Sequence, residues 1–301
     1  MGTLQRPPLL SPGARVALVA PSGPLRDDAD LQRAIDAAHA LGWETVVGAH
    51  VMERVGYLAG DDAHRLADLN RVATDASVDG VWCIRGGYGA MRLLDGIDYD
   101  AWCRRPRALI GYSDITALHA AIGARAGLVT YHGPTARRTI TEVSGATLRA
   151  AVVDGTNSCG HAPSAIPLHP GRARGRLVGG NLALVAALCG TPYAASLDGA
   201  ILVLEDVNEA VYRIDRMWTQ LRLSGGFDRL GGIAFGQFTE IPVEPGHEGR
   251  PLLDLLEEIA ARTGVPCLAN IPLGHVADQW TVPLGAIAEL DADARTLTVE
   301  T

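Results

Sequence analysis

The sequence contains no lysine, so all 26 of its basic residues are arginine. Without lysine the chain cannot supply the phosphate-binding lysine of a P-loop, a Schiff-base amine or a Ser-Lys catalytic dyad. Acidic residues also outnumber basic ones, which gives a formal net charge of -8 at pH 7. A protein whose main task is to bind nucleic acid needs a positive surplus to displace counterions from phosphates. The composition therefore argues against nucleic acid as a partner.

Long hydrophobic runs and paired cysteines are missing as well. No segment approaches the roughly 20 apolar residues of a membrane-spanning helix, and the first residues contain no apolar signal core. The five cysteines include no CxxC pair, and three of them stand in apolar runs. We expect buried free thiols in a reducing compartment. These features predict a cytoplasmic protein with no membrane partner.

The first half of the chain alternates short apolar runs with segments of helical spacing. Residues 15–20 read as a buried strand, and residues 27–41 carry apolar side chains at the spacing of an amphipathic helix. The same two patterns recur, with strands predicted at 43–47, 80–84, 108–110 and 127–131 and helices at 61–74 and 114–122. Such alternation predicts an α/β fold with a mostly parallel sheet and helices on both faces.

Periodicity fades between residues 136 and 174, where residues 147–153 could form one short helix, and a second unit follows. We expect an N-terminal domain at 1–135, a linker or covering loop at 136–174 and a C-terminal β/α domain at 175–301. In the last segment the patterns predict strands at 176–178, 201–205, 232–235 and 266–269, helices at 181–188, 208–223 and 252–262, and a closing hairpin of 284–290 with 296–299.

Ser113 occupies a position suited to a nucleophile. The apolar run Ala108–Ile110 predicts a buried strand, Gly111 allows a tight turn, and a helical spacing begins at Asp114. A serine on a strand-to-helix turn presents its hydroxyl at the sheet edge, where the first helix amides point. Ile115 stands where the usual elbow has glycine, so a plain helix-capping serine is the alternative.

Two further residues at predicted strand ends match this serine chemically. Glu205 ends one strand and His275 follows another, with Arg85 and His132 as additional strand-end candidates. A serine hydroxyl needs an imidazole to accept its proton, and the imidazole needs a carboxylate to fix its tautomer. The alternatives are a solvated or helix-capping acid at 205 and an ordinary turn residue at 275.

The glycine run Arg85-Gly-Gly-Tyr-Gly89 suggests close backbone approach to a ligand. It is not a GxGxxG motif and has no acidic ribose partner, so a dinucleotide site is disfavoured. Adjacent glycines let a backbone amide approach a substrate carbonyl; a tight turn is the alternative. Arg85 could bind a substrate carboxylate, because guanidinium groups pair with carboxylates through two bonds. An ion pair with a nearby acid is the competing interpretation.

Acidic and histidine residues near helix starts predict no metal site. Asp61, Asp62 and His64 begin one predicted helix, where acids are favoured by the helix dipole. Asp98 and Asp100 fit the same explanation. We expect neither a metal nor another cofactor.

Six motifs span nearly the whole chain: Ala20-Pro-Ser-Gly-Pro24, Arg85-Gly-Gly-Tyr-Gly89, Gly111-Tyr-Ser-Asp-Ile-Thr116, Gly179-Gly-Asn-Leu182, Leu204-Glu-Asp-Val-Asn-Glu209 and Pro272-Leu-Gly-His275. Together, and in this order, they resemble the motifs of the LD-carboxypeptidase family of serine peptidases. That family includes muramoyl-tetrapeptide carboxypeptidases and microcin C self-immunity proteins.

The resemblance implies a role for each matched residue. Ser113 would be the nucleophile, His275 the general base and Glu205 the orienting acid, with an oxyanion hole from the amides of Gly87 and Asp114. It also implies two domains, the first carrying the serine and the second the acid and histidine. The site would then form only where the domains meet.

The resemblance further implies a substrate class. The usual family activity removes the terminal D-alanine from cytoplasmic murein tetrapeptide, cutting an L-to-D bond in cell-wall recycling, and members are commonly homodimers. Immunity-type members instead cleave peptidyl or aminoacyl nucleotides and carry an aromatic residue on the loop before the acid. Residues 136–174 contain no Trp, Tyr or Phe, which favours the murein peptide. A small-ligand binding protein with vestigial catalytic residues is a third hypothesis.

Overall fold

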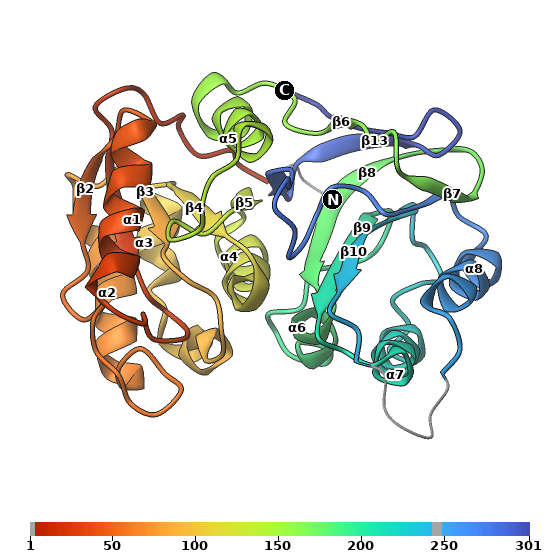
Figure 1. Ribbon diagram of the computed structural model, residues 1–301, viewed down its shortest axis with the longest axis horizontal. Helices are drawn as coiled ribbons and strands as arrows, with labels where there is room; N and C mark the ends of the chain where they lie inside the picture. Colours follow the sequence, from red (N-terminus) through yellow and green to blue (C-terminus); the bar gives the residue numbers. More distant parts are fainter. Residues whose placement is uncertain (1–3, 243–248) are drawn as a thin grey trace.

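The computed structural model describes residues 4–242 and 249–301, and the chain forms two units that lie side by side (Figure 1). The first unit is built on a six-stranded sheet. Its strands, in order across the sheet, are β12 (Val282–Leu284), β5 (Thr130–His132), β4 (Ala108–Gly111), β3 (Gly80–Cys83), β1 (Arg15–Val19) and β2 (Glu44–Val47). All neighbouring pairs are parallel except β12 with β5.

Helices cover both faces of this sheet, as the alternating pattern predicted. Val16 and Leu18 of β1 pack in one apolar cluster with Ala34 and Ala38 of α1 (Asp28–Ala40). The intervening residues of β1 point to the opposite face, where α2 (Asp62–Thr74), α3 (Tyr99–Arg104) and α4 (Thr116–Ala126) pack. Two 3₁₀ turns, η1 (Ala90–Gly96) and η2 (Ser113–Ile115), connect strands to helices at the same edge of the sheet.

The second unit contains an eight-stranded sheet with a parallel centre. Its order is β6 (Gly160–His161), β14 (Thr296–Val299), β13 (Ile287–Asp291), β8 (Arg172–Asn181), β9 (Ile201–Val207), β10 (Gly232–Thr239), β11 (Cys267–Ala269) and β7 (Ile166–His169). Strands β8 to β11 are parallel, and β13 and β14 form the predicted antiparallel hairpin. Three helices pack on one face: α6 (Leu182–Ala187), α7 (Val211–Leu223) and α8 (Leu252–Thr263).

Residues 136–174 carry more regular structure than the short helix suggested at 147–153. Helix α5 (Glu142–Arg149) starts at Thr141, whose hydroxyl accepts the Ser144 amide, and continues into a π-helical turn, η3 (Ala150–Asp154). Strands β6 and β7 then join the outer edges of the second sheet. Strands of two and four residues are too short for a period-2 pattern to be recognised. The two short strands of this segment therefore belong to the second unit's sheet, and α5 with η3 precedes them in the chain.

Strand β12 ties the two units together. The sequence boundaries assigned residues 282–284 to the C-terminal domain, yet they pair with β5 at the edge of the first sheet. One apolar cluster also runs through both units, containing Tyr131 and Val282 of the first sheet and Leu177 and Val203 of the second. Burial of this shared surface fixes how the two sheets sit against each other.

The structure bears on the expected state of the cysteines and on the expected lack of a membrane-spanning helix. All five cysteines are free thiols, as expected. Cys83 and Cys267 are buried, but Cys103 is exposed, so the expectation that the thiols are buried is wrong for Cys103. None of the helices within residues 4–242 and 249–301 combines the length and hydropathy of a membrane-spanning helix.

Candidate active site

Ser113 lies on the turn that follows the buried strand β4. Its backbone has φ 65, in the left-handed region that residues other than glycine seldom adopt. Such a conformation costs about 1–3 kcal/mol and persists only where the surroundings enforce it. Helix α4 starts directly after the turn, so the predicted strand, turn and helix are all present.

Glu205 and His275 reach this serine from the second unit. His275 Nε2 lies 3.2 Å from Ser113 Oγ, and His275 Nδ1 lies 2.8 Å from Glu205 Oε2. These contacts join residues 162 and 70 positions apart in the chain. The strand-end positions predicted for all three side chains therefore converge where the two sheets meet.

The electrostatics of this chain of contacts define the protonation of the imidazole. Glu205 is fully buried and His275 retains 17% of its side-chain exposure. A carboxylate only accepts hydrogen bonds, so the contact favours the tautomer in which Nδ1 is protonated and donates a hydrogen bond to Glu205. Nε2 is then free to accept the Ser113 hydroxyl proton. The arrangement can deprotonate the serine and stabilise the resulting imidazolium.

Close backbone packing holds Glu205 in place. Gly274, at φ 115, passes so near that a Cβ atom there would lie 2.9 Å from both the Cβ and Oε2 atoms of Glu205. A Cβ on Gly236 would lie 3.1 Å from the Glu205 Cβ. Two glycines therefore leave room for the carboxylate and fix its position relative to His275.

Asp206, which follows Glu205, connects this strand end to the start of α6. Its carboxylate accepts the Asn181 side-chain amide at 2.8 Å and the backbone amides of Val207 and Ala183 at 2.9 Å. Burial is the main cause that raises the pKa of Asp206 to about 6, and the nearby Glu205 charge adds to it. No sequence pattern pointed to a role for this residue.

The glycine run after β3 packs directly against the serine. A Cβ atom on Gly86 would lie 2.9 Å from the Ser113 Cβ and 3.2 Å from its Oγ, so only glycine fits without displacing the serine. Gly87 is exposed and has φ 123. The Gly23 amide, on the loop after β1, donates to the Gly86 carbonyl at 3.1 Å and holds the run in position.

Asp114 links the same run to the serine turn. Its buried carboxylate accepts the Ala90 amide at 2.8 Å, and burial raises its pKa. The family resemblance implied a role for the Asp114 backbone amide alone. The structure gives the side chain a second use, because it joins the glycine run to the residue beside Ser113.

Tyr112, beside the serine, has a contact that the sequence did not suggest. Its ring centroid lies 4.8 Å from that of His275, and its hydroxyl accepts a hydrogen bond from Arg138. His132, the other strand-end histidine, is fully buried, with its ring 6.1 Å from Tyr112. Burial lowers the pKa of His132 well below its usual range, so it stays neutral at pH 7.

The acids and the histidine that begin α2 have structural partners. Asp61 caps the helix by accepting the His64 amide, and Asp62 pairs with Arg92. His64 also comes near His50 and Glu53, with one nitrogen or oxygen of each residue within 4.8 Å of the others. The two imidazole rings are stacked at 4.3 Å with an interplanar angle of 12°. Because a bound ion lies in the plane of each imidazole, two parallel stacked rings cannot share one as they stand.

Comparison with known proteins agrees with the two-unit architecture. Residues 16–133 match the LD-carboxypeptidase N-terminal domain, and residues 174–290 match the LD-carboxypeptidase C-terminal domain. A putative carboxypeptidase of Streptomyces coelicolor is 44% identical, covering 100% of this chain and 97% of its own. The murein tetrapeptide carboxypeptidase of Pseudomonas aeruginosa is 34% identical, covering 93% of this chain and 94% of its own.

A solved structure shares the fold at lower sequence identity. The microcin C7 self-immunity protein MccF, in complex with aspartyl sulfamoyl adenosine, superposes with a TM-score of 0.88 over 100% of this chain and 99% of its own, at 22% identity. At that identity the likeness concerns the fold alone. The domain matches and the full-length relatives together show that this chain belongs to the LD-carboxypeptidase family.

Proposed function

We propose that this protein is a serine carboxypeptidase that cuts an L-to-D peptide bond and releases the terminal D-alanine of murein tetrapeptide in the cytoplasm. The observation that carries the proposal is the continuous chain of contacts from Ser113 through His275 to Glu205. Family membership supports a peptidase. The murein tetrapeptide carboxypeptidase of Pseudomonas aeruginosa, 34% identical over nearly the whole chain, supports the substrate.

In the proposed reaction Ser113 Oγ attacks the carbonyl carbon before the terminal residue while His275 Nε2 takes its proton. The Gly87 and Asp114 amides would stabilise the negative oxygen of the tetrahedral intermediate. His275 then donates the proton to the leaving amine, and D-alanine departs. Water, deprotonated by His275, hydrolyses the acyl-serine, while Glu205 holds the imidazole orientation throughout.

An immunity-type amidase acting on aminoacyl nucleotides is the second candidate. The shared fold with MccF favours it, but residues 136–174 offer no aromatic ring to stack on a nucleobase. The higher sequence identity to the murein enzyme, 34% against 26% for MccF, also weighs against it. A binding protein without catalysis is disfavoured, because it would have no need of the strained serine and aligned imidazole.

The decisive experiment measures D-alanine release from murein tetrapeptide by the purified protein and by Ser113→Ala. We expect at least a ~10³-fold loss of kcat/KM in the variant, because its side chain has no nucleophilic oxygen. Ser77→Ala, at an exposed serine on the loop before β3, is the matched control and should keep full activity.

Three outcomes separate the candidates. Full activity in Ser113→Ala would show that the serine is not the nucleophile. Hydrolysis of an acyl-sulfamoyl adenosine without cleavage of the tetrapeptide would establish the immunity type. Binding of either compound with no turnover would establish the non-catalytic hypothesis.

A further inference from the structure

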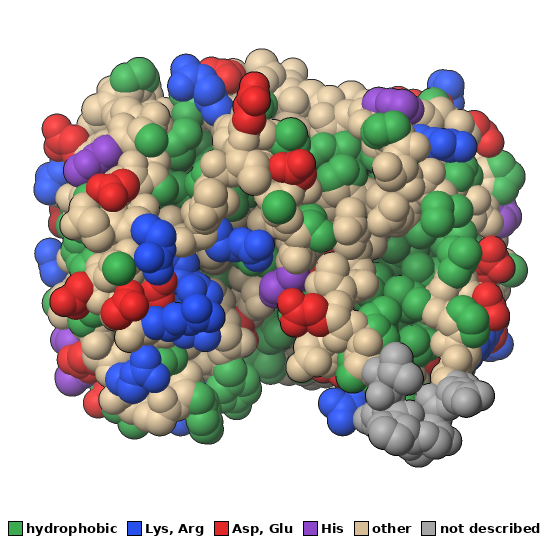
Figure 2. Space-filling view, in the orientation of Figure 1, with side chains coloured by type: hydrophobic (Ala, Val, Ile, Leu, Met, Phe, Trp, Pro, Cys, Tyr) green, Lys and Arg blue, Asp and Glu red, His purple; other side chains and the backbone are tan. Residues whose placement is uncertain are grey.

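Four arginines lie on the loops at the carboxyl ends of the strands around Ser113. Because β1, β2, β3 and β5 run parallel, these ends share one edge of the sheet. The loops after them carry Arg26, Arg54, Arg85 and Arg137 respectively. Figure 2 shows arginine side chains gathered on the first unit beside the hollow between the two units. We call these four residues the arginine cluster.

Arg85 is a half-buried member with no acidic partner. One of its terminal nitrogens donates to the Pro24 carbonyl. Among residues 4–242 and 249–301, no carboxylate oxygen lies within 4.0 Å of the Arg26, Arg54 or Arg85 guanidinium groups. Burial, followed by the charges of Arg137 and Arg26, lowers the pKa of Arg85. The ion pair with a nearby acid, which competed with substrate binding as an interpretation of Arg85, is thus absent from the described residues.

Arg137 shares one buried carboxylate with other groups. Asp30 is fully buried, accepts the Arg26 backbone amide at 2.9 Å and pairs with Arg33. Arg137 Nη1 lies 3.6 Å from the same carboxylate, and Arg137 Nε is buried without a hydrogen-bond partner among the described residues. The single negative charge of Asp30 therefore faces two guanidinium groups, those of Arg33 and Arg137. Uncompensated charge in a partly buried place is costly unless an anion occupies it.

Two members of the cluster, Arg85 and Arg137, lie beside the serine turn. Arg85 directly precedes Gly86, which packs against Ser113, and its Nε would lie 3.5 Å from a Cβ atom on Gly23. Arg137 follows β5, but its backbone amide donates to the Ile84 carbonyl at 3.2 Å, directly before Arg85 in the chain, and its charge acts on both Arg85 and Tyr112. Residues 85 and 137 therefore lie next to each other at the end of β3, where one carboxylate could meet both guanidinium groups.

We propose that Arg85 and Arg137 bind the C-terminal carboxylate of the residue that leaves. In a peptide cut before its last residue, that carboxylate is three bonds from the carbonyl carbon that Ser113 attacks. An exopeptidase therefore needs its anion site close to the nucleophile, and Arg85 directly precedes the glycine that packs against Ser113. Guanidinium groups suit the task because they grip a carboxylate through two parallel bonds. The inference rests on the proposed function. It explains why the enzyme would act only on peptides with a free C-terminal carboxylate.

The test measures binding without turnover, so that it does not depend on catalysis. In the Ser113→Ala background, calorimetry compares murein tetrapeptide with the same peptide amidated at its C-terminus. We expect the free acid to bind about 10- to 100-fold more tightly than the amide, as charge-assisted hydrogen bonds would give. Adding Arg85→Ala or Arg137→Ala should remove most of that preference.

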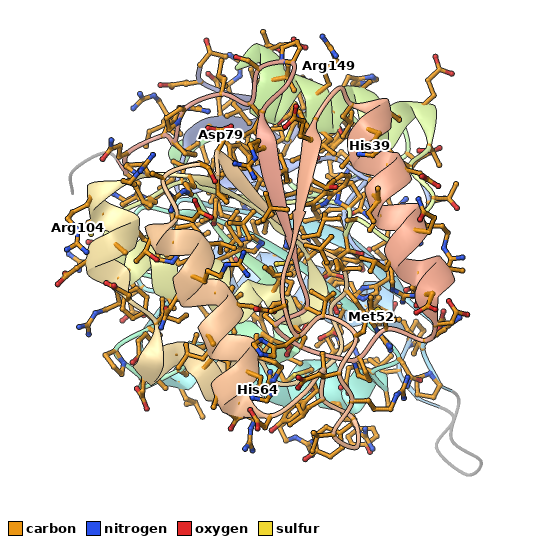
Figure 3. All side chains as sticks on the ribbon, turned by 90° about the vertical axis from the view of Figure 1, so that its left-hand side faces the viewer. His39, Met52, His64, Asp79, Arg104 and Arg149 are labelled. Carbon is orange, nitrogen blue, oxygen red and sulfur yellow. The ribbon has the colours of Figure 1, made fainter. Side chains whose placement is uncertain are left out.

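Two further variants separate binding from folding. Arg85→Lys keeps the positive charge, so it should retain part of the preference for the free acid over the amide. If Arg85→Ala lost the preference only because the fold collapsed, Arg85→Lys would not be expected to restore it. Arg104→Ala changes an exposed arginine on α3, which Figure 3 shows on the outer surface, and should leave the preference unchanged.

The outcomes distinguish this inference from the proposed function. Equal binding of acid and amide, or no measurable binding of the acid, would overturn the anion site even if the unmodified protein releases D-alanine. A preference for the acid that both alanine variants lose would support the site even if no D-alanine is released, in which case the proposed reaction fails alone.

Discussion

Gly274 and Glu205 are packed so closely that a methyl group on Gly274 would overlap the carboxylate that faces His275. The glycine directly precedes the histidine, so the same residue sets the path of the chain into the site and leaves room for the acid. Its φ of 115 is a conformation that only glycine adopts at low cost. Backbone conformation, rather than a further hydrogen bond, thus governs the spacing of this pair.

Gly274→Ala should lower kcat by about 100-fold, because a displacement of roughly 1 Å at a catalytic group has an effect of that size. The added Cβ atom would push Glu205 and His275 apart. Gly264→Ala is a suitable control, since Gly264 has φ 64 at the end of α8 with no atom within 4 Å of an added Cβ. It should lose about 1 kcal/mol of stability while keeping its kcat. Unchanged kcat in Gly274→Ala would refute the positioning role.

Asp206 should make the folded state less stable as the pH rises. Its pKa is raised from 3.8 to about 6, so the folded chain binds this proton more tightly than the unfolded chain does. The contribution of this proton to the free energy of unfolding is fully present below pH 3.8 and is lost as the pH rises through about 6. Urea unfolding between pH 4 and pH 7 should therefore show the native protein losing stability relative to Asp206→Asn. Parallel pH profiles for the two proteins would contradict the prediction.

Arg107→Met should destabilise the first unit without touching the site. The buried guanidinium donates to the carbonyls of Val78, Ala73 and Asp75, and the substitution leaves all three without that donor. We expect a loss of about 3 kcal/mol in the free energy of unfolding. Arg105→Met, in which an exposed side chain loses one bond to the Ala76 carbonyl, should cost under about 1 kcal/mol. Urea titration of both variants checks this, and equal costs would show that burial is not the cause.

Local features of the sequence determined much of the fold. The apolar run 108–110, the glycine that follows this run at position 111 and the helical spacing from Asp114 predicted the strand, the turn and the helix that the structure contains. Glu205 and His275 could be chosen because polar residues at the ends of apolar strands lie at the ligand-binding edge of a parallel sheet. These predictions worked because burial leaves a periodic pattern within a few residues.

The tertiary structure decided what depends on residues far apart in the chain. The left-handed backbone of Ser113, the pairing of β12 with the first sheet and the sharing of Asp30 by Arg33 and Arg137 leave no local pattern. Nor could periodicity show that residues 136–174 complete the second sheet, because their strands are too short. By itself the sequence determined which side chains could do chemistry and where strands would end. Only packing between the two units decided their distances, because contact, burial and charge balance are set by neighbours in space.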